Sequence, residues 1–303
     1  MRVLGKYWRS LVGAMDKEAF RIVYRILVNN EKFEVNAHML KRCIDAAAKN
    51  KVLLHFLRML NVYNSIRFHE ETKYRIFLRN LHIVAESLNN LNYVFIKFRK
   101  PIVYVPSDID ILINRDDIEK AINRLGEKGF RIKIIEPYCI TMVCKNSIVD
   151  FYVYPTIGGM IYLDAEKLIE HSEYISFNGL KIPVLKTYAE VLMTITHAIY
   201  KERIYTLNDY IVARTWFSEE VIDLARELSC INALEKALTI HRLVERQNFI
   251  LPHKIPLAEW TSLLGSKILY DKLSRTTFFN FLKTFKDLRF GRLILSKLMR
   301  ETY

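Results

Sequence analysis

Hydrophobic positions recur at helical spacing through the first 90 residues of the chain. In one stretch the apolar residues stand three and four apart, at Ala19, Ile22, Val23, Ile26 and Leu27. This spacing is typical of the buried face of an amphipathic helix. The pattern continues to about Leu91. It predicts that residues 1–90 form an N-terminal helical region.

Between residues 91 and 185 the pattern changes to short runs rich in β-branched and aromatic residues, which favour strands. Strands are predicted at Tyr93–Ile96, Asp108–Ile113 and Phe130–Ile135, and hairpins at 138–154 and around 177–182. A helix is predicted before the third strand, capped by Asp116 or Asp117 and ended by Gly129. Helical spacing returns after Pro183 and continues to the C-terminus.

We therefore expect an α+β fold in which a small mixed β-sheet lies between two helical regions. The expected boundaries are 1–90 for the N-terminal helices, 91–185 for the α/β core and 186–303 for the C-terminal helices. No apolar run approaches the roughly 20 residues of a spanning helix, so no membrane partner is expected. Charges at the start of the chain, Met1 to Arg9, disfavour a signal peptide.

The cysteines give no sign of a metal or disulfide framework. Cys139 and Cys144 are five residues apart with no matching second pair, which is poor spacing for zinc. Reduced thiols packed as small hydrophobic groups, in a cytoplasmic protein, are the simpler expectation.

The net charge of +13 is concentrated at the two ends of the chain. Residues 1–80 carry 16 Lys and Arg against 7 Asp and Glu, and residues 261–303 carry 9 against 3. Near the C-terminus the basic residues recur at three-residue spacing, at Lys283, Lys286, Arg289 and Arg292. Such basic ends suit a polyanion such as nucleic acid, although basic helices are often only solvated faces.

The most informative motif is a pair of acids, Asp108 and Asp110, at the start of an apolar β-branched run. Side chains alternate faces along a strand, so both carboxylates point the same way. Two neighbouring acids repel each other unless a cation lies between them. Asp150 opens a later predicted strand, which can lie beside the first. Three carboxylates around one point can hold two magnesium ions and a nucleotide's phosphates.

This middle region resembles the nucleotidyltransferase superfamily typified by DNA polymerase β, and within it the prokaryotic minimal nucleotidyltransferases. Asp108-Ile109-Asp110 matches the paired-acid motif, and Asp150 matches the third acid. Lys97 stands where that branch has a lysine at the end of a strand. The resemblance continues through residues 180–185 and Leu207-Asn208-Asp209-Tyr210, and covers about 120 residues, from Tyr93 to Thr215.

The resemblance implies a metal-dependent enzyme that transfers a nucleoside monophosphate from an NTP to a hydroxyl. Asp108, Asp110 and Asp150 would be catalytic and would bind Mg²⁺ or Mn²⁺, and Lys97 and Ser107 would contact the nucleotide. RNA, for example the 3′ end of a tRNA, is the first expectation for the acceptor, with a protein or a small molecule as alternatives. Relatives of this branch include tRNA-modifying toxins, which adds a toxin–antitoxin partner to the expectations.

Two positions depart from the family pattern. Phe98 follows the lysine, and Ser107 precedes the first acid, where glycine is usual. Glycine lets backbone N–H groups approach phosphate oxygens. Lys97, Arg99 and Lys100 could supply charge instead. The alternative is a catalytically degenerate member of the fold that acts as a nucleic-acid-binding or protein-interaction module.

Overall fold

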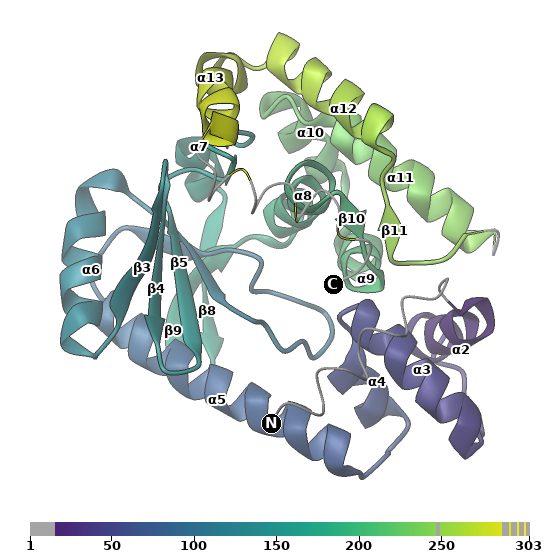
Figure 1. The fold of residues 1–303 in the computed structure, drawn as a ribbon. Coiled ribbons are helices and arrows are strands. Elements are labelled where there is room, and N and C mark those ends of the chain that lie inside the picture. Colours follow the sequence, from purple (N-terminus) through teal and green to yellow (C-terminus); the bar gives the residue numbers. More distant parts are fainter. Residues whose placement is uncertain (1–15, 247–248, 287–290, 292–295, 297–299, 301–303) are drawn as a thin grey trace.

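A computed structural model describes residues 16–246, 249–286, 291, 296 and 300 of the chain. It is an α+β fold in which one mixed β-sheet is flanked by helices on both faces (Figure 1), as the sequence predicted.

The main sheet has seven strands in the order β3-β4-β5-β2-β1-β9-β8. Their bounds are β1 Tyr93–Phe95, β2 Ile109–Ile113, β3 Arg131–Glu136, β4 Cys139–Cys144, β5 Ser147–Tyr152, β8 Ser172–Phe177 and β9 Leu180–Leu185. Strand β2 pairs in parallel with β5, and β1 pairs in parallel with β9, whereas the other neighbours are antiparallel. Every strand of this sheet lies between residues 93 and 185, within the range the composition indicated.

Helices precede, interrupt and follow the sheet. Before it come α2 Lys17–Val28, α3 Ala37–Lys49, α4 Leu53–Met59 and α5 Ser65–Ser87. Within it lie the short η1 Arg115–Asp117, α6 Ile118–Glu127 and α7 Ala165–Glu170. After it come α8 Thr187–Thr196, the π-helical turn η2 His197–Glu202, α9 Leu207–Trp216, α10 Glu219–Glu227, α11 Ile231–Glu245, α12 Leu257–Tyr270 and α13 Lys272–Lys286.

The two faces of the sheet are buried in different clusters. Helices α5 and α6 cover one face, where Leu81 and Leu125 pack with Ile109, Ile111 and other inward residues. The opposite face, which carries Leu112 and Tyr152, joins a larger core shared by the N-terminal and C-terminal helices. Because side chains alternate along β2 and β5, the acids project from this second face.

Two local predictions need correction. Asp117 is the N-cap residue of α6, as predicted, but its side chain accepts a hydrogen bond from the Asn92 backbone N–H and makes no capping hydrogen bond. The side-chain cap of the preceding turn η1 comes from Asn114. The C-terminal region is not wholly helical, because β10 Ile204–Tyr205 pairs with β11 His253–Lys254. A second short pair, β6 Thr156–Ile157 with β7 Met160–Ile161, follows β5.

Cys43, Cys139, Cys144 and Cys230 are free thiols, as expected. Within the part of the chain that the structure describes, no helix is both long and apolar enough to cross a membrane.

Candidate active site

The register between two parallel strands brings the three predicted acids together. Asp110 on β2 pairs directly with Asp150 on β5, and Asp108 precedes Asp110 by two residues. One carboxylate oxygen from each acid lies within 4.8 Å of the others. Two oxygens on opposite sides of one magnesium ion are about 4.2 Å apart. The limit of 4.8 Å is close to this span, so the acids lie near the spacing of a divalent-cation site.

Asp110 is the most buried of the three acids, and its side chain is 7% exposed. The ammonium of Lys97 lies 2.7 Å from its Oδ1 atom. Burial raises the pKa of Asp110 to about 6; Lys97 opposes this shift, and Asp108 and Asp150 add to it. Oδ1 is therefore paired with the Lys97 ammonium. Carboxylate oxygens are also the ligands that hard divalent cations prefer.

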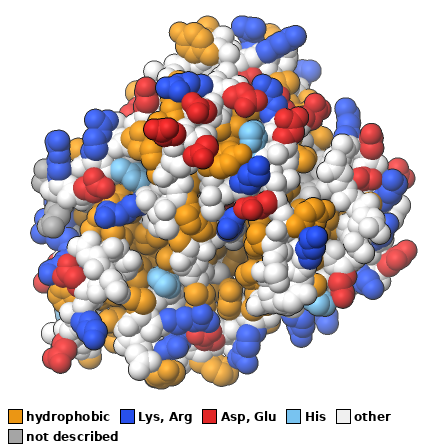
Figure 2. All heavy atoms as spheres, turned by 180° about the vertical axis from the view of Figure 1, so that it is seen from behind, with side chains coloured by type: hydrophobic (Ala, Val, Ile, Leu, Met, Phe, Trp, Pro, Cys, Tyr) orange, Lys and Arg blue, Asp and Glu red, His pale blue; other side chains and the backbone are white. Residues whose placement is uncertain are grey.

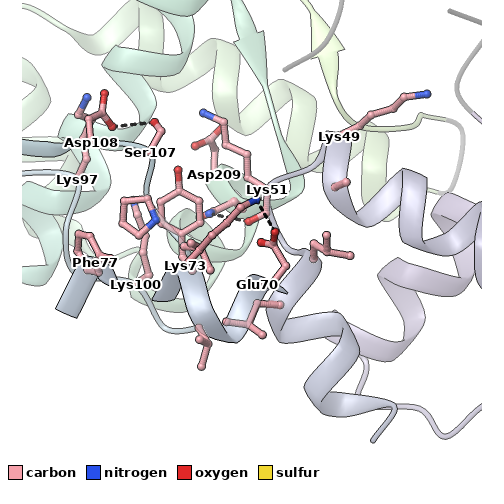
Figure 3. A pocket seen from close by; sticks show the side chains of 18 of the residues that line it. Lys49, Lys51, Glu70, Lys73, Phe77, Lys97, Lys100, Ser107, Asp108 and Asp209 are labelled. Atoms are coloured by element: carbon pink, nitrogen blue, oxygen red, sulfur yellow. Dashed lines mark hydrogen bonds and ion pairs between the residues drawn. The ribbon is translucent and has the colours of Figure 1, made fainter. Parts of the chain in front are cut away.

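The other two acids are held by hydroxyl groups. Thr141, opposite Asp150 on the neighbouring strand β4, donates to its Oδ1 at 2.6 Å, and the Tyr152 hydroxyl donates to its Oδ2 at 3.2 Å. Ser107 donates to Oδ1 of Asp108 at 3.0 Å. Two predicted nucleotide contacts, Lys97 and Ser107, thus lie at the acids (Figure 3).

Lys97 has left-handed backbone geometry, with φ at 55°. Its backbone N–H donates to Oε2 of Glu190 at 3.1 Å. Glu190 is fully buried, and burial raises its pKa to about 7 although Lys100, 3.4 Å from Oε1, opposes the shift. Burial acts to lower the pKa of Lys97, but the charges of Asp110 and Asp108 outweigh it, and this pKa is raised.

The missing glycine at position 98 has a structural explanation. The left-handed residue is Lys97, whereas Phe98 packs its ring against those of Phe95 and Phe177. Glycine is therefore not required at position 98 by the backbone conformation. Arg99 forms an ion pair with Glu173, and Lys100 forms one with Glu190. The charges of these two residues are therefore paired with acids other than Asp108, Asp110 and Asp150.

The acids open into a cavity of about 1910 Å³. Its other walls come from the loop 97–107, from α3 and α5, and from η2 and α9 (Figure 3). Small-molecule pockets usually measure about 300–1,000 Å³. This cavity is therefore larger than a site for a single small molecule. On the face seen in Figure 2, Lys and Arg side chains are interspersed with Asp and Glu.

Two further residues of the resembling region have structural partners. Asp209 forms a capping box with Thr206 at the start of α9. His197 is half-buried at the cavity wall, with Nδ1 3.5 Å from the Tyr162 hydroxyl and Nε2 3.6 Å from Glu202.

Sequence reasoning missed three groups that contact the acids or their partners. Thr141 lies opposite Asp150 because Cys144 pairs with Ser147 across the hairpin. A hairpin centred on residue 146, as the predicted range 138–154 implies, would place Met142 there instead. Tyr152 shares a face with Asp150 because it lies two residues further along the strand. Lys201 contacts Tyr152 from a π-helical turn. The sequence gives no pattern from which this contact could have been predicted.

Comparisons with known proteins give little guidance. No protein-family model and no curated protein matches this chain. Among solved structures, the chain is similar to the solution structure of the antibiotic-resistance factor ANT(2'')-Ia. The similarity covers 56% of this chain and 98% of that one, with 12% sequence identity and a TM-score of 0.38. Likeness at this level does not assign the chain to a family.

Proposed function

We propose that the protein is a metal-dependent nucleotidyltransferase that transfers a nucleoside monophosphate from an NTP to a hydroxyl and releases pyrophosphate. The convergence of Asp108, Asp110 and Asp150 at a cavity carries this proposal. Asp108, Asp110 and Asp150 would hold Mg²⁺ or Mn²⁺. The ions would neutralise phosphate charge and lower the pKa of the acceptor hydroxyl.

Each remaining residue at the site has a proposed role. Asp150 accepts the proton of the attacking hydroxyl, because Thr141 and Tyr152 hold its carboxylate in one orientation. Lys97 binds a phosphate oxygen with the ammonium that lies beside Asp110. The Ser107 hydroxyl turns from Asp108 to donate to the same phosphate group.

RNA, including the 3′ end of a tRNA, is the acceptor that we propose first. Lys41 and Lys49 of α3 and Lys73 of α5 also line the cavity and support this choice. Lys49 and Lys73 are paired with acids at 2.7 Å, so they supply only part of their charge. Of the predicted C-terminal bases, Lys283 is exposed, whereas Arg289 and Arg292 lie outside the described residues. We also propose that the protein is cytoplasmic and that it has a toxin–antitoxin partner.

One observation favours the alternative of a binding module that keeps the fold without the chemistry. The Lys97 ammonium, 2.7 Å from Asp110, supplies positive charge to the buried carboxylate without any metal ion. A site of this kind is electrostatically satisfied in the absence of a nucleotide.

The test is incubation of the full-length protein with each labelled NTP, Mg²⁺ or Mn²⁺, and total RNA. We expect label transfer that Asp110→Ala abolishes and that Asp116→Ala, a change of an exposed acid outside the site, leaves unchanged. No transfer to any acceptor, together with RNA binding that Asp110→Ala does not alter, would contradict the enzyme and support the binding module.

A further inference from the structure

A chain of hydrogen bonds leads from Lys201 to the third acid. The Lys201 ammonium lies 3.1 Å from the Tyr152 hydroxyl, which lies 3.2 Å from Oδ2 of Asp150. An ammonium is only a donor, so the Tyr152 oxygen accepts from Lys201. The hydroxyl proton is thereby left for Asp150. The direction of both hydrogen bonds is fixed by the chemistry of the three groups.

Asp150 is consequently held at both oxygens. Tyr152 donates to Oδ2, and Thr141 donates to Oδ1 at 2.6 Å from the adjacent strand. Rotation of the carboxylate would break at least one of these hydrogen bonds. The ring of Tyr152 is 4% exposed, and the Lys201 ammonium lies 4.7 Å from its centroid. Tyr152 is therefore itself immobilised by packing and by a cation–π contact.

The π-helical turn η2 carries Lys201. It follows α8 directly, and its end is marked by an i→i+5 hydrogen bond from the Arg203 N–H to the Ala198 carbonyl. In an α-helix, Glu202 would be rotated about 140° away from His197. With one extra residue in the turn, Glu202 returns to the side of His197 on which Lys201 also lies. All three line the cavity.

We propose that Tyr152 and Lys201 are positioning residues for Asp150. The inference rests on the proposed function, because it assigns Asp150 to a divalent-metal site. Groups that hydrogen-bond to metal ligands typically change metal affinity about 10- to 100-fold when they are removed. Neither residue needs to touch the metal ion or the substrate in this role.

The test measures Mn²⁺ affinity of the nucleotide-free, full-length protein by electron paramagnetic resonance. We expect Tyr152→Phe, which keeps the ring and removes the hydroxyl, to weaken Mn²⁺ binding about tenfold. Lys201→Gln should weaken it in the same direction, and Lys201→Arg, which keeps a cationic donor, should recover most of the affinity. Tyr154→Phe is the matched control, because the Tyr154 hydroxyl donates to Glu166 rather than to the acids.

Unchanged Mn²⁺ affinity in a folded Tyr152→Phe protein overturns the positioning role while leaving the proposed function intact. Wild-type affinity in Asp110→Asn and Asp150→Asn overturns the metal site itself, and with it the proposed function. Circular dichroism checks the fold of each variant. If Tyr152→Phe does not fold, Lys201→Gln decides alone, since Lys201 is only partly buried, and unchanged Mn²⁺ affinity there overturns the proposal.

Discussion

At the scale of single residues, Lys97 joins two features of the site. Its ammonium compensates the buried charge of Asp110, and its backbone N–H is anchored by the buried Glu190. Removing one partner of a buried ion pair leaves an uncompensated charge, which typically costs about 3–5 kcal/mol. The lysine is therefore expected to matter for stability before any substrate is bound.

We predict that Lys97→Met lowers the free energy of unfolding by about 3 kcal/mol, because Asp110 then remains buried beside two other carboxylates. In the double variant with Asp110→Asn the loss should be much smaller than the sum of the two single losses. Urea denaturation at pH 7 measures all three proteins. Lys133→Met, at an exposed position on β3, is the control. Simple additivity of the two changes would argue against the ion pair.

His241 provides a pH-dependent test away from the site. Burial, with a smaller contribution from Arg214, lowers its pKa to about 4, whereas an unfolded histidine titrates near 6.5. The unfolded chain therefore binds the proton first as pH falls. The stability contributed by neutral His241 is present above pH 6.5 and is lost as pH falls towards 4.

In His241→Gln, the drop in unfolding free energy between pH 7 and pH 4.5 should be smaller by about 2–3 kcal/mol than in the wild-type protein. Thermal or urea unfolding at the two pH values measures it. The exposed His38→Gln should keep the wild-type pH dependence. An identical pH dependence in the His241 variant would show that the histidine is not buried in its neutral form.

At the scale of elements, Asn50 ties three segments together at the end of α3. Its side chain is fully buried, accepts from the Leu207 N–H at 2.9 Å and donates to the Leu251 carbonyl at 2.7 Å. These bonds fix the start of α9 and the segment before β11 against the N-terminal helices. Their loss would leave buried backbone groups without partners.

We predict that Asn50→Ala destabilises the protein by about 3 kcal/mol, from two unsatisfied backbone groups at about 1–3 kcal/mol each. Chemical denaturation measures the loss, and Asn89→Ala, at an exposed position, should change stability little. A cost below about 1 kcal/mol would mean that water replaces the missing amide.

The helices and strands also show how much of the fold could be predicted from the sequence. Period-two alternation was sufficient to place Asp108 and Asp110 on one face of a strand. The sequence indicated only that the strand of Asp150 can lie beside it, because the parallel register of β2 with β5 depends on the path of the chain between them. The π-helical turn could not be predicted, since one inserted residue leaves the hydrophobic spacing of α8 almost unchanged. The capping role of Asn114 was missed because Asn114, Asp116 and Asp117 all have side chains that can cap a helix.

At the scale of the whole molecule, the N-terminal and C-terminal helices share one core. Phe20 and Val23 of α2 belong to the same cluster as Tyr210 of α9 and Ala237 of α11. The hydroxyls of Tyr24 and Tyr210 lie 3.1 Å apart, which links the two regions directly. The division at residues 90 and 186 stays a prediction about sequence regions, and the shared core argues against independent folding.

We therefore predict a single cooperative unfolding transition for the full chain. Far-ultraviolet circular dichroism and tryptophan fluorescence should give coincident urea curves, because Trp216 and Trp260 lie in C-terminal helices while the dichroism reports on every helix. Two separated transitions would show that the N-terminal helices fold independently.

The pairing of Asp110 with Asp150 in adjacent parallel strands has a last consequence. Hydrogen-bonded strands lie about 4.8 Å apart in any β-sheet. The separation of Asp110 and Asp150 is thus set by the backbone of the sheet. Substitutions of neighbouring side chains can change the charge of the site or the access to it, but they do not change this separation. The sequences of the surrounding loops and helices can therefore vary while the two acids keep their spacing.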